Sequence, residues 1–164
     1  MIPIISFVGR SNSGKTTYLL KLIRELKNRG YKVAVIKHRH GNFEIDQPGK
    51  DTWLHAEAGA DVVMISSAQK MAVIKKTEYE LPLEELALYA NNVDLIVTEG
   101  YKKANTKKIE FLRSAISNQL VCEEKDLLAI VTDLHNKFSV PTFDYDSISE
   151  LVDFITEDII TVAE

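Results

Sequence analysis

The feature that most constrains the fold is a glycine-containing motif near the start of the sequence. Residues 9–16 read Gly-Arg-Ser-Asn-Ser-Gly-Lys-Thr, a complete match to the pattern G-x-x-x-x-G-K-[ST]. The β-branched run Ile2–Val8 precedes the loop, and a segment with apolar residues at helical spacing follows it: Leu19, Leu22, Ile23 and Leu26. Because a strand enters the motif and a helix leaves it, the sequence predicts a P-loop that binds a nucleoside triphosphate.

Each residue type in this loop has a chemical role. Gly9 and Gly14 permit backbone angles that turn successive N–H groups toward phosphate oxygens, and the following helix adds its positive end. We expect Lys15 to reach the β- and γ-phosphates as a catalytic group, and the Thr16 hydroxyl to bind Mg²⁺. The predicted nucleotide-binding residues are Gly9, Ser11, Asn12, Ser13, Gly14, Lys15, Thr16 and Thr17.

A second metal ligand is expected because Mg²⁺ requires an octahedral set of oxygen atoms. The apolar run Val93–Thr98 predicts a buried strand that ends at Glu99-Gly100. Ligands of an open parallel sheet lie beyond the carboxyl ends of its strands. Glu99 is therefore a predicted metal ligand and catalytic residue, with a helix cap or a surface carboxylate as the alternative, and Asp94 is predicted to be structural.

The segment 38–50 follows a second predicted strand, Val33–Ile36, and has no regular pattern; long loops of this kind are often functional. It contains Asp46-Gln47-Pro48-Gly49, the D-x-x-G pattern through which GTPases sense a γ-phosphate. Asp46 is therefore a second candidate metal ligand and catalytic residue. Lys50 is a candidate phosphate contact, and Asp51 a candidate cap of a short helix.

Other polar residues leave structural and functional interpretations open. His38 and His40 are either two metal ligands or part of a polar loop with one buried histidine. The lysines within residues 102–108 form either a solvated turn or a surface for an anion. Asp133 follows the predicted strand Leu127–Val131, where many GTPases carry the aspartate that binds guanine, but the lysine of the full base motif is absent.

Strands that alternate with helices predict a single three-layer α/β domain over residues 1–164, with a mostly parallel sheet. The further predicted elements are strands at Val62–Ser66, Met71–Lys76, Ile109–Arg113 and Pro141–Phe143, and helices around Leu83–Ala90 and Ile148–Ile159. The pair at 62–76 and the strand at 109–113 lack an obvious crossover segment. We therefore expect some antiparallel pairing there.

Composition narrows the classes of function. The chain has 164 residues, 45% hydrophobic and 27% charged, as in an average soluble protein. A net charge of −4 excludes a general nucleic-acid binder driven by bulk charge, and a single cysteine, Cys122, excludes an internal disulfide. No apolar run reaches the about 20 residues that span a bilayer, and no basic leader precedes the first strand. We expect a cytoplasmic protein with no nucleic-acid or membrane partner.

Six short blocks, one of them the P-loop, form a set that covers most of residues 1–133. They are Gly9–Thr17, Ile36-Lys37-His38-x-His40, Asp46-x-Pro48-Gly49-Lys50-Asp51, Ala58-Gly59-Ala60, Val97-x-Glu99-Gly100-Tyr101-Lys102 and Lys108-Ile109-x-x-x-Arg113. In sequence and in order, these blocks resemble the motifs of the molybdopterin-guanine dinucleotide biosynthesis protein B (MobB) family. Two positions depart from the pattern: Gly41 stands where members often have a histidine, which weakens a histidine-based role, and Thr52 replaces a common serine.

The resemblance implies a P-loop NTPase fold and a GTP-binding protein of molybdenum-cofactor biosynthesis. Members of the family have weak GTPase activity, form homodimers and assist the guanylyltransferase that attaches GMP to molybdopterin. The cofactor and ligand are then Mg²⁺ and GTP, with the guanylyltransferase and molybdopterin as partners. Guanine preference is implied by the family together with the position of Asp133.

Two other functions remain open. A small-molecule P-loop kinase would usually carry an arginine-rich lid, whereas the arginines here are scattered along the chain: Arg10, Arg24, Arg29, Arg39 and Arg113. A nucleotide-dependent adaptor without turnover fits the same motifs. The loop 38–50 favours a switch over a kinase lid but does not separate slow hydrolysis from none.

Overall fold

A computed structural model describes residues 2–135 and 137–160. The chain packs into two compact units, one made of residues 1–38 and 83–164 and the other of residues 39–82. The expectation of one domain over the whole chain stays a prediction. Within the described ranges, no helix has the length and the apolar character needed to cross a membrane.

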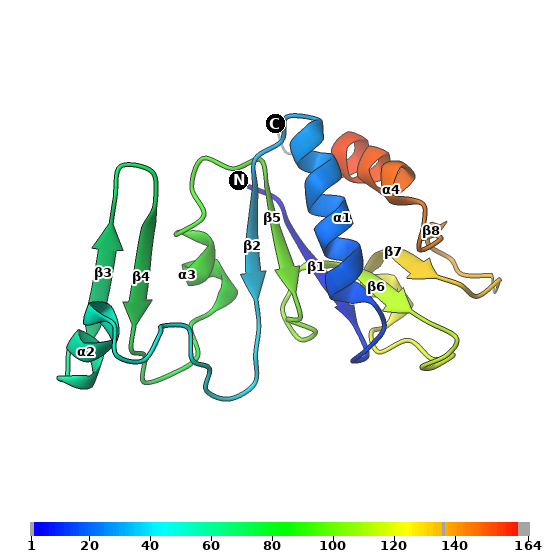
Figure 1. Cartoon of the computed structure of the whole chain (residues 1–164). Helices are drawn as coiled ribbons and strands as arrows, with labels where there is room; N and C mark the ends of the chain where they lie inside the picture. Colours follow the sequence, from blue (N-terminus) through cyan, green and yellow to red (C-terminus); the bar gives the residue numbers. More distant parts are fainter. Residues whose placement is uncertain (1, 136, 161–164) are drawn as a thin grey trace. The chain divides into compact units, whose positions relative to one another are not determined.

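The first unit is built on a six-stranded sheet whose strands are all parallel, in the order β2-β5-β1-β6-β7-β8 (Figure 1). Its central strands are buried over most of their length, which explains their continuous apolar runs. The strands are β1 (Ile4–Gly9), β2 (Val33–Lys37), β5 (Leu95–Glu99), β6 (Lys107–Leu112), β7 (Leu127–Thr132) and β8 (Thr142–Phe143).

Two helices lie side by side over one face of this sheet (Figure 1). Helix α1 spans Lys15–Asn28, and α4 spans Ile148–Ile155 and continues as a π-helical turn at Thr156–Ile160. Their apolar stripes, which include Leu22 and Leu151, pack on the buried aromatic rings of the sheet. The unit also contains a short helix, α3 (Leu83–Ala87), and a 3₁₀ turn at Glu124–Asp126.

The second unit contains helix α2 (Asp51–Glu57) and the antiparallel strands β3 (Val62–Ser66) and β4 (Met71–Lys75). This pairing confirms the antiparallel prediction for residues 62–76. A turn closed by the Ser67 N–H and the Lys70 carbonyl oxygen, 2.8 Å apart, joins the strands. The Lys76 ammonium donates to the Ala56 carbonyl oxygen over 3.0 Å and so ties the hairpin to α2.

Two local predictions are wrong. Strand β6 is parallel to its neighbours, because it begins level with Ile5 whereas β5 ends level with Phe7. The chain therefore has only a short distance to return, and residues 100–106 cover it without a helix. Asp51 is the first residue of α2 and not its cap; the cap position belongs to Lys50, which makes no side-chain capping bond.

The P-loop strand lies so close to β6 that only glycine fits at its end. A Cβ at Gly9 would lie 2.6 Å from the Phe111 carbonyl oxygen, and the backbone φ is +139°. We expect Gly9→Ala to destabilise the protein more than Gly30→Ala, a matched control with φ of +91° and no atom near the new Cβ. The control should lose about 1–2 kcal/mol from backbone strain alone, and Gly9→Ala about 1–3 kcal/mol more from overpacking.

Chemical denaturation of the parent and both variants measures the difference in the free energy of unfolding. Equal losses for Gly9→Ala and Gly30→Ala would show that the contact with β6 relaxes at no cost.

Candidate functional site

The P-loop connects β1 to α1 in the conformation that the glycine pattern predicts. Gly9, Asn12 and Gly14 all have positive φ angles, of 139°, 63° and 86°. Gly14 occupies the cap position of α1, and no side chain caps the first turn, which also carries no acidic residue. Ser11, Asn12, Thr16 and Thr17 are exposed at this end of the helix. The free N–H groups of the first turn are therefore open to an anion.

Lys15 folds back over the loop from which it comes. Its ammonium lies 2.7 Å from the Arg10 carbonyl oxygen and 3.2 Å from that of Gly9, and also contacts Ser13 Oγ. Burial lowers the pKa of this lysine; Glu99 opposes the shift, and the ammonium groups of Lys102 and Lys37 add to it. The charges of Lys37 and Glu99 offset each other, so Lys15 and Lys102 leave a net positive charge that favours an anion.

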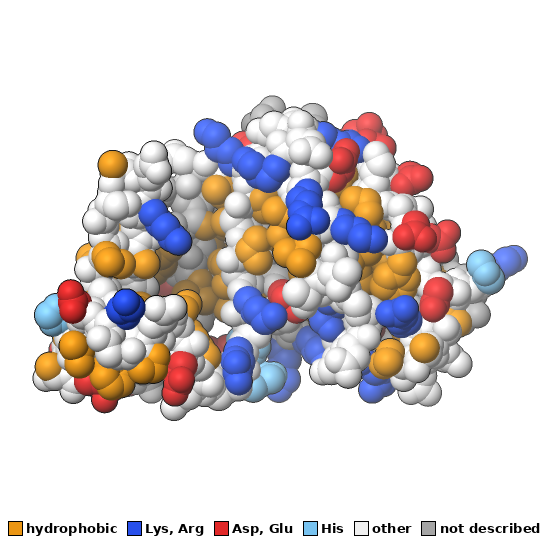
Figure 2. Space-filling model, in the orientation of Figure 1, with side chains coloured by type: hydrophobic (Ala, Val, Ile, Leu, Met, Phe, Trp, Pro, Cys, Tyr) orange, Lys and Arg blue, Asp and Glu red, His pale blue; other side chains and the backbone are white. Residues whose placement is uncertain are grey.

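Glu99 ends β5 and meets the first turn of α1. Thr16 Oγ donates a hydrogen bond to Glu99 Oε1 over 2.7 Å, and the Lys37 ammonium at the end of β2 lies 3.1 Å from Oε2. Glu99 therefore lies beside the loop, as expected, and its carboxylate has one hydroxyl partner and one ammonium partner. In Figure 2, Lys and Arg side chains gather at the lower edge of the view, below the ends of β2, β5 and β1.

An aromatic residue from the last part of the chain supports the P-loop. The Tyr145 hydroxyl donates to the Ser13 carbonyl oxygen over 2.9 Å. The Arg113 guanidinium carbon lies 5.5 Å from the centre of the Tyr145 ring, within the range of a cation–π interaction. No role for Tyr145 follows from the sequence, because nothing in the pattern around it distinguishes it from a core residue.

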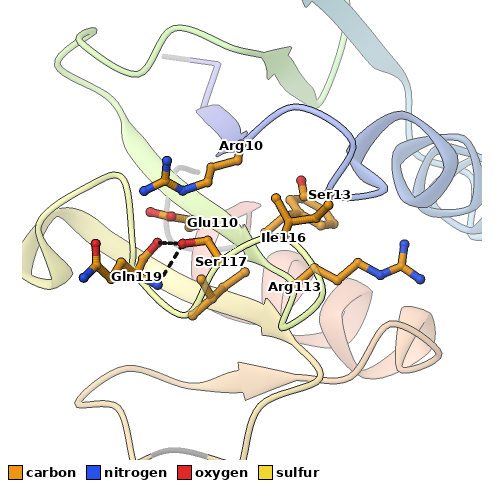
Figure 3. Close-up of a pocket in the computed structure, with 9 residues that line it drawn as sticks. Arg10, Ser13, Glu110, Arg113, Ile116, Ser117 and Gln119 are labelled. Atoms are coloured by element: carbon orange, nitrogen blue, oxygen red, sulfur yellow. Dashed lines mark hydrogen bonds between the residues drawn. The ribbon is translucent and has the colours of Figure 1, made fainter.

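A narrow recess separates the P-loop from the segment after β6 (Figure 3). Buried Glu110 is one of the residues that line it and accepts hydrogen bonds from the N–H groups of Val121 and Cys122, over 2.6 and 3.0 Å. Burial raises the pKa of this carboxyl, and the two N–H groups oppose the rise. Glu110 thus anchors the segment that carries Arg113 past the loop, a role that does not follow from the sequence pattern.

Asp133 lies at the end of β7, as expected, and is exposed. Both of its carboxylate oxygens accept hydrogen bonds from Ser114, from the N–H over 2.7 Å and from the hydroxyl over 3.0 Å. The N–H bond lowers the pKa of Asp133. A carboxylate has further lone pairs, so its role in guanine binding stays a prediction.

Asp46 and Lys50 belong to the second unit. Asp46 Oδ1 accepts a hydrogen bond from the Gln47 N–H over 2.8 Å, whereas the buried Oδ2 has no partner among the described residues. The roles of both residues toward phosphate or metal stay predictions. The His38 ring contacts that of Tyr101, with centroids 4.9 Å apart. Across residues 2–135 and 137–160, no cluster of three or more His, Cys, Asp or Glu residues forms a metal site by itself.

The lysines after Glu99 divide into two kinds. Lys102 is exposed and acts electrostatically on Lys15. Lys107 and Lys108 lie in β6, and Lys108 is buried, with its ammonium 3.0 Å from the Thr106 carbonyl oxygen. The interpretation of the whole run as a solvated turn is therefore wrong, because two of its four lysines lie in strand β6. Asp94 is structural, as expected: its Oδ2 accepts a hydrogen bond from the Lys32 N–H.

Comparison with known proteins gives a consistent assignment. The family model described as "Molybdopterin guanine dinucleotide synthesis protein B" matches residues 4–133. The molybdopterin-guanine dinucleotide biosynthesis adapter protein of Escherichia coli K12 is 35% identical to this chain. The matched region covers 96% of this chain and 93% of the Escherichia coli protein. The protein of that name from Haemophilus influenzae is 35% identical over 94% of this chain and 88% of its own.

Solved structures agree with this assignment. The crystal structure of Bacillus subtilis MobB is 26% identical, has a TM-score of 0.76 and covers 94% of this chain and 96% of its own. A second structure, titled molybdopterin-guanine biosynthesis protein B, is 29% identical with a TM-score of 0.70 and covers 93% of this chain and 96% of its own. The predicted P-loop α/β fold is thereby confirmed. The chain belongs to the MobB family of molybdopterin guanine dinucleotide synthesis proteins.

Proposed function

We propose that the chain binds GTP with Mg²⁺, hydrolyses it slowly and acts as an adapter in the cytoplasm. The names of the relatives support a role in molybdenum-cofactor biosynthesis. The partner that fits this role is the guanylyltransferase that attaches GMP to molybdopterin, with molybdopterin itself as a further ligand. An adapter without turnover is the second candidate, because the word adapter in the relatives' names does not require hydrolysis.

The single observation that carries nucleotide binding is the position of Glu99 against the P-loop. A hydroxyl oxygen of Thr16 and a carboxylate oxygen of Glu99 lie 2.7 Å apart at the open end of α1. Neighbouring oxygen ligands of octahedral Mg²⁺ are about 3 Å apart, so these two residues fit the ion. When bound, Mg²⁺ would neutralise charge on the β- and γ-phosphates.

Other groups of the protein are candidates for binding the triphosphate and for positioning the metal or the attacking water. Lys15 exchanges its contacts with loop carbonyl oxygens for phosphate oxygens, and the N–H groups of the loop and first helical turn orient the triphosphate. Asp46 is the further candidate for the metal or the attacking water, supported by its buried carboxylate oxygen that lacks a partner within the described residues. Lys50 is a further candidate for phosphate.

Preference for guanine is expected from Asp133 at the end of β7. A carboxylate accepts hydrogen bonds from the N1 and N2 donors of guanine but meets an acceptor at N1 of adenine. Competition calorimetry should show Mg·GTP bound at least tenfold more tightly than Mg·ATP, about 1.4 kcal/mol, with the gap lost in Asp133→Ala. Lys15→Ala is the control, because it should weaken both nucleotides by at least tenfold. Equal affinity of the parent for both nucleotides would remove the guanine assignment.

The metal role of Glu99 is tested by Glu99→Gln, which keeps the size of the side chain and removes its charge. We expect the variant to bind Mg·GTP at least tenfold more weakly and to lose hydrolysis in single-turnover assays. Binding in EDTA should change less than threefold, because no metal is then held. If Asp46→Asn shows this behaviour and Glu99→Gln does not, the metal depends on Asp46. A parent that binds Mg·GTP without any hydrolysis identifies the adapter without turnover.

A homodimer is proposed for the second unit because one face of its hairpin is apolar and exposed. Met64 pairs across the strands with Val73, and Val62 and Met71 lie on the same face by the alternation of side chains. Met64 and Met71 are 65% and 68% exposed. A two-stranded hairpin is marginally stable in water, so a second copy covering this face would stabilise it.

Light scattering coupled to size-exclusion chromatography should give the parent the mass of a dimer. Met64→Glu should shift it to a monomer, because a carboxylate would be buried at the interface, without changing its far-UV circular dichroism. The control is Gln69→Glu, which adds the same charge at the exposed turn of this hairpin and should stay dimeric. A monomeric parent would contradict the proposal.

A further inference from the structure

Lys37 is the cation that Glu99 holds in this structure. The two residues are directly paired in the parallel register of β2 and β5, at the carboxyl ends of both strands. The Lys37 ammonium lies 3.1 Å from Glu99 Oε2, while Oε1 accepts the hydrogen bond from Thr16. Both oxygens of the carboxylate are therefore engaged, one by each of these side chains.

The ion pair can open without disturbing the sheet. The Lys37 side chain is 61% exposed and that of Glu99 only 16%, so the lysine is the mobile partner. Backbone bonds keep the strand ends together on their own, including the His38 N–H bond to the Glu99 carbonyl oxygen over 3.0 Å. Because water screens the exposed Lys37 ammonium, the ion pair contributes only about 1 kcal/mol or less, which the binding of a divalent ion can offset.

Two cations compete for this carboxylate once Mg²⁺ arrives. Lysine is a compact point charge on a flexible stem and can leave without unfolding its strand. Without a cation beside it, the Glu99 carboxylate would repel the triphosphate that the P-loop attracts. Some positive charge must therefore stay at Glu99 whether or not the metal is present.

We propose that Lys37 is a placeholder for Mg²⁺: it neutralises Glu99 in the metal-free protein and is released when Mg²⁺ takes the carboxylate. This inference rests on the proposed binding of Mg·GTP, and it assigns to Lys37 a positioning role that acts through Glu99. It differs from a permanent phosphate contact, which would contribute equally with and without the metal.

GTP affinity measured by calorimetry in EDTA and in Mg²⁺ separates these roles. Lys37→Gln should weaken GTP binding in EDTA at least tenfold, since Glu99 is then unneutralised, but change it less than threefold in Mg²⁺. Adding Glu99→Gln to that variant should restore binding in EDTA to within threefold of the parent. The matched control, Lys32→Gln, removes the same charge from an exposed lysine just before the other end of β2 and should leave both affinities unchanged.

The outcomes distinguish this inference from the function on which it rests. A parent that does not bind Mg·GTP overturns both. A parent that binds, with Lys37→Gln equally weakened in EDTA and in Mg²⁺, leaves the proposed function standing and makes Lys37 a phosphate contact. Failure of Glu99→Gln to restore binding in EDTA likewise overturns the placeholder role, since Lys37 would then act through another group.

Discussion

The parallel register between β1 and β5 is the constraint on which the site depends. Phe7 lies opposite Glu99 in this register, close to the point where β1 gives way to the P-loop. The last side chain of β5 therefore meets the first turn of α1, where the Thr16 hydroxyl binds it. A slip of one residue would turn Glu99 to the opposite face of the sheet and leave the loop without an acidic partner.

Parts of this site can be predicted from the sequence because they depend on neighbours along the chain. The P-loop needs only its glycines, Lys15 and the change from strand to helix, and Glu99 needs only a buried strand that ends in an acid. The Lys37–Glu99 pair depends on β2 lying beside β5, and these two residues are 62 positions apart. Periodicity reports which face of a strand is buried but not which strand lies next to it.

Other differences between the predictions from sequence and the structure also arise from contacts between distant parts of the chain. The direction of β6 depends on the offset along β1 between the end of β5 and the start of β6, which no local pattern encodes. Asp133 can be placed at a strand end from its apolar run, whereas its hydrogen bonds to Ser114 follow from β6 and β7 being neighbours. Glu110 is a comparable case. It is an acid inside an apolar strand, and its hydrogen-bond donors belong to a segment that comes later in the sequence and folds back onto it.

The bond from the Tyr145 hydroxyl to Ser13 has a consequence for the order in which the protein assembles. The P-loop is synthesised before the residue that supports it, because Tyr145 follows Ser13 by 132 positions. A contact between such distant positions carries a larger loop-closure entropy cost than a contact between neighbours in sequence. The anion-binding loop is therefore made before the residue that holds it in place. A nascent chain that stops short of β8 contains the loop but lacks this tyrosine.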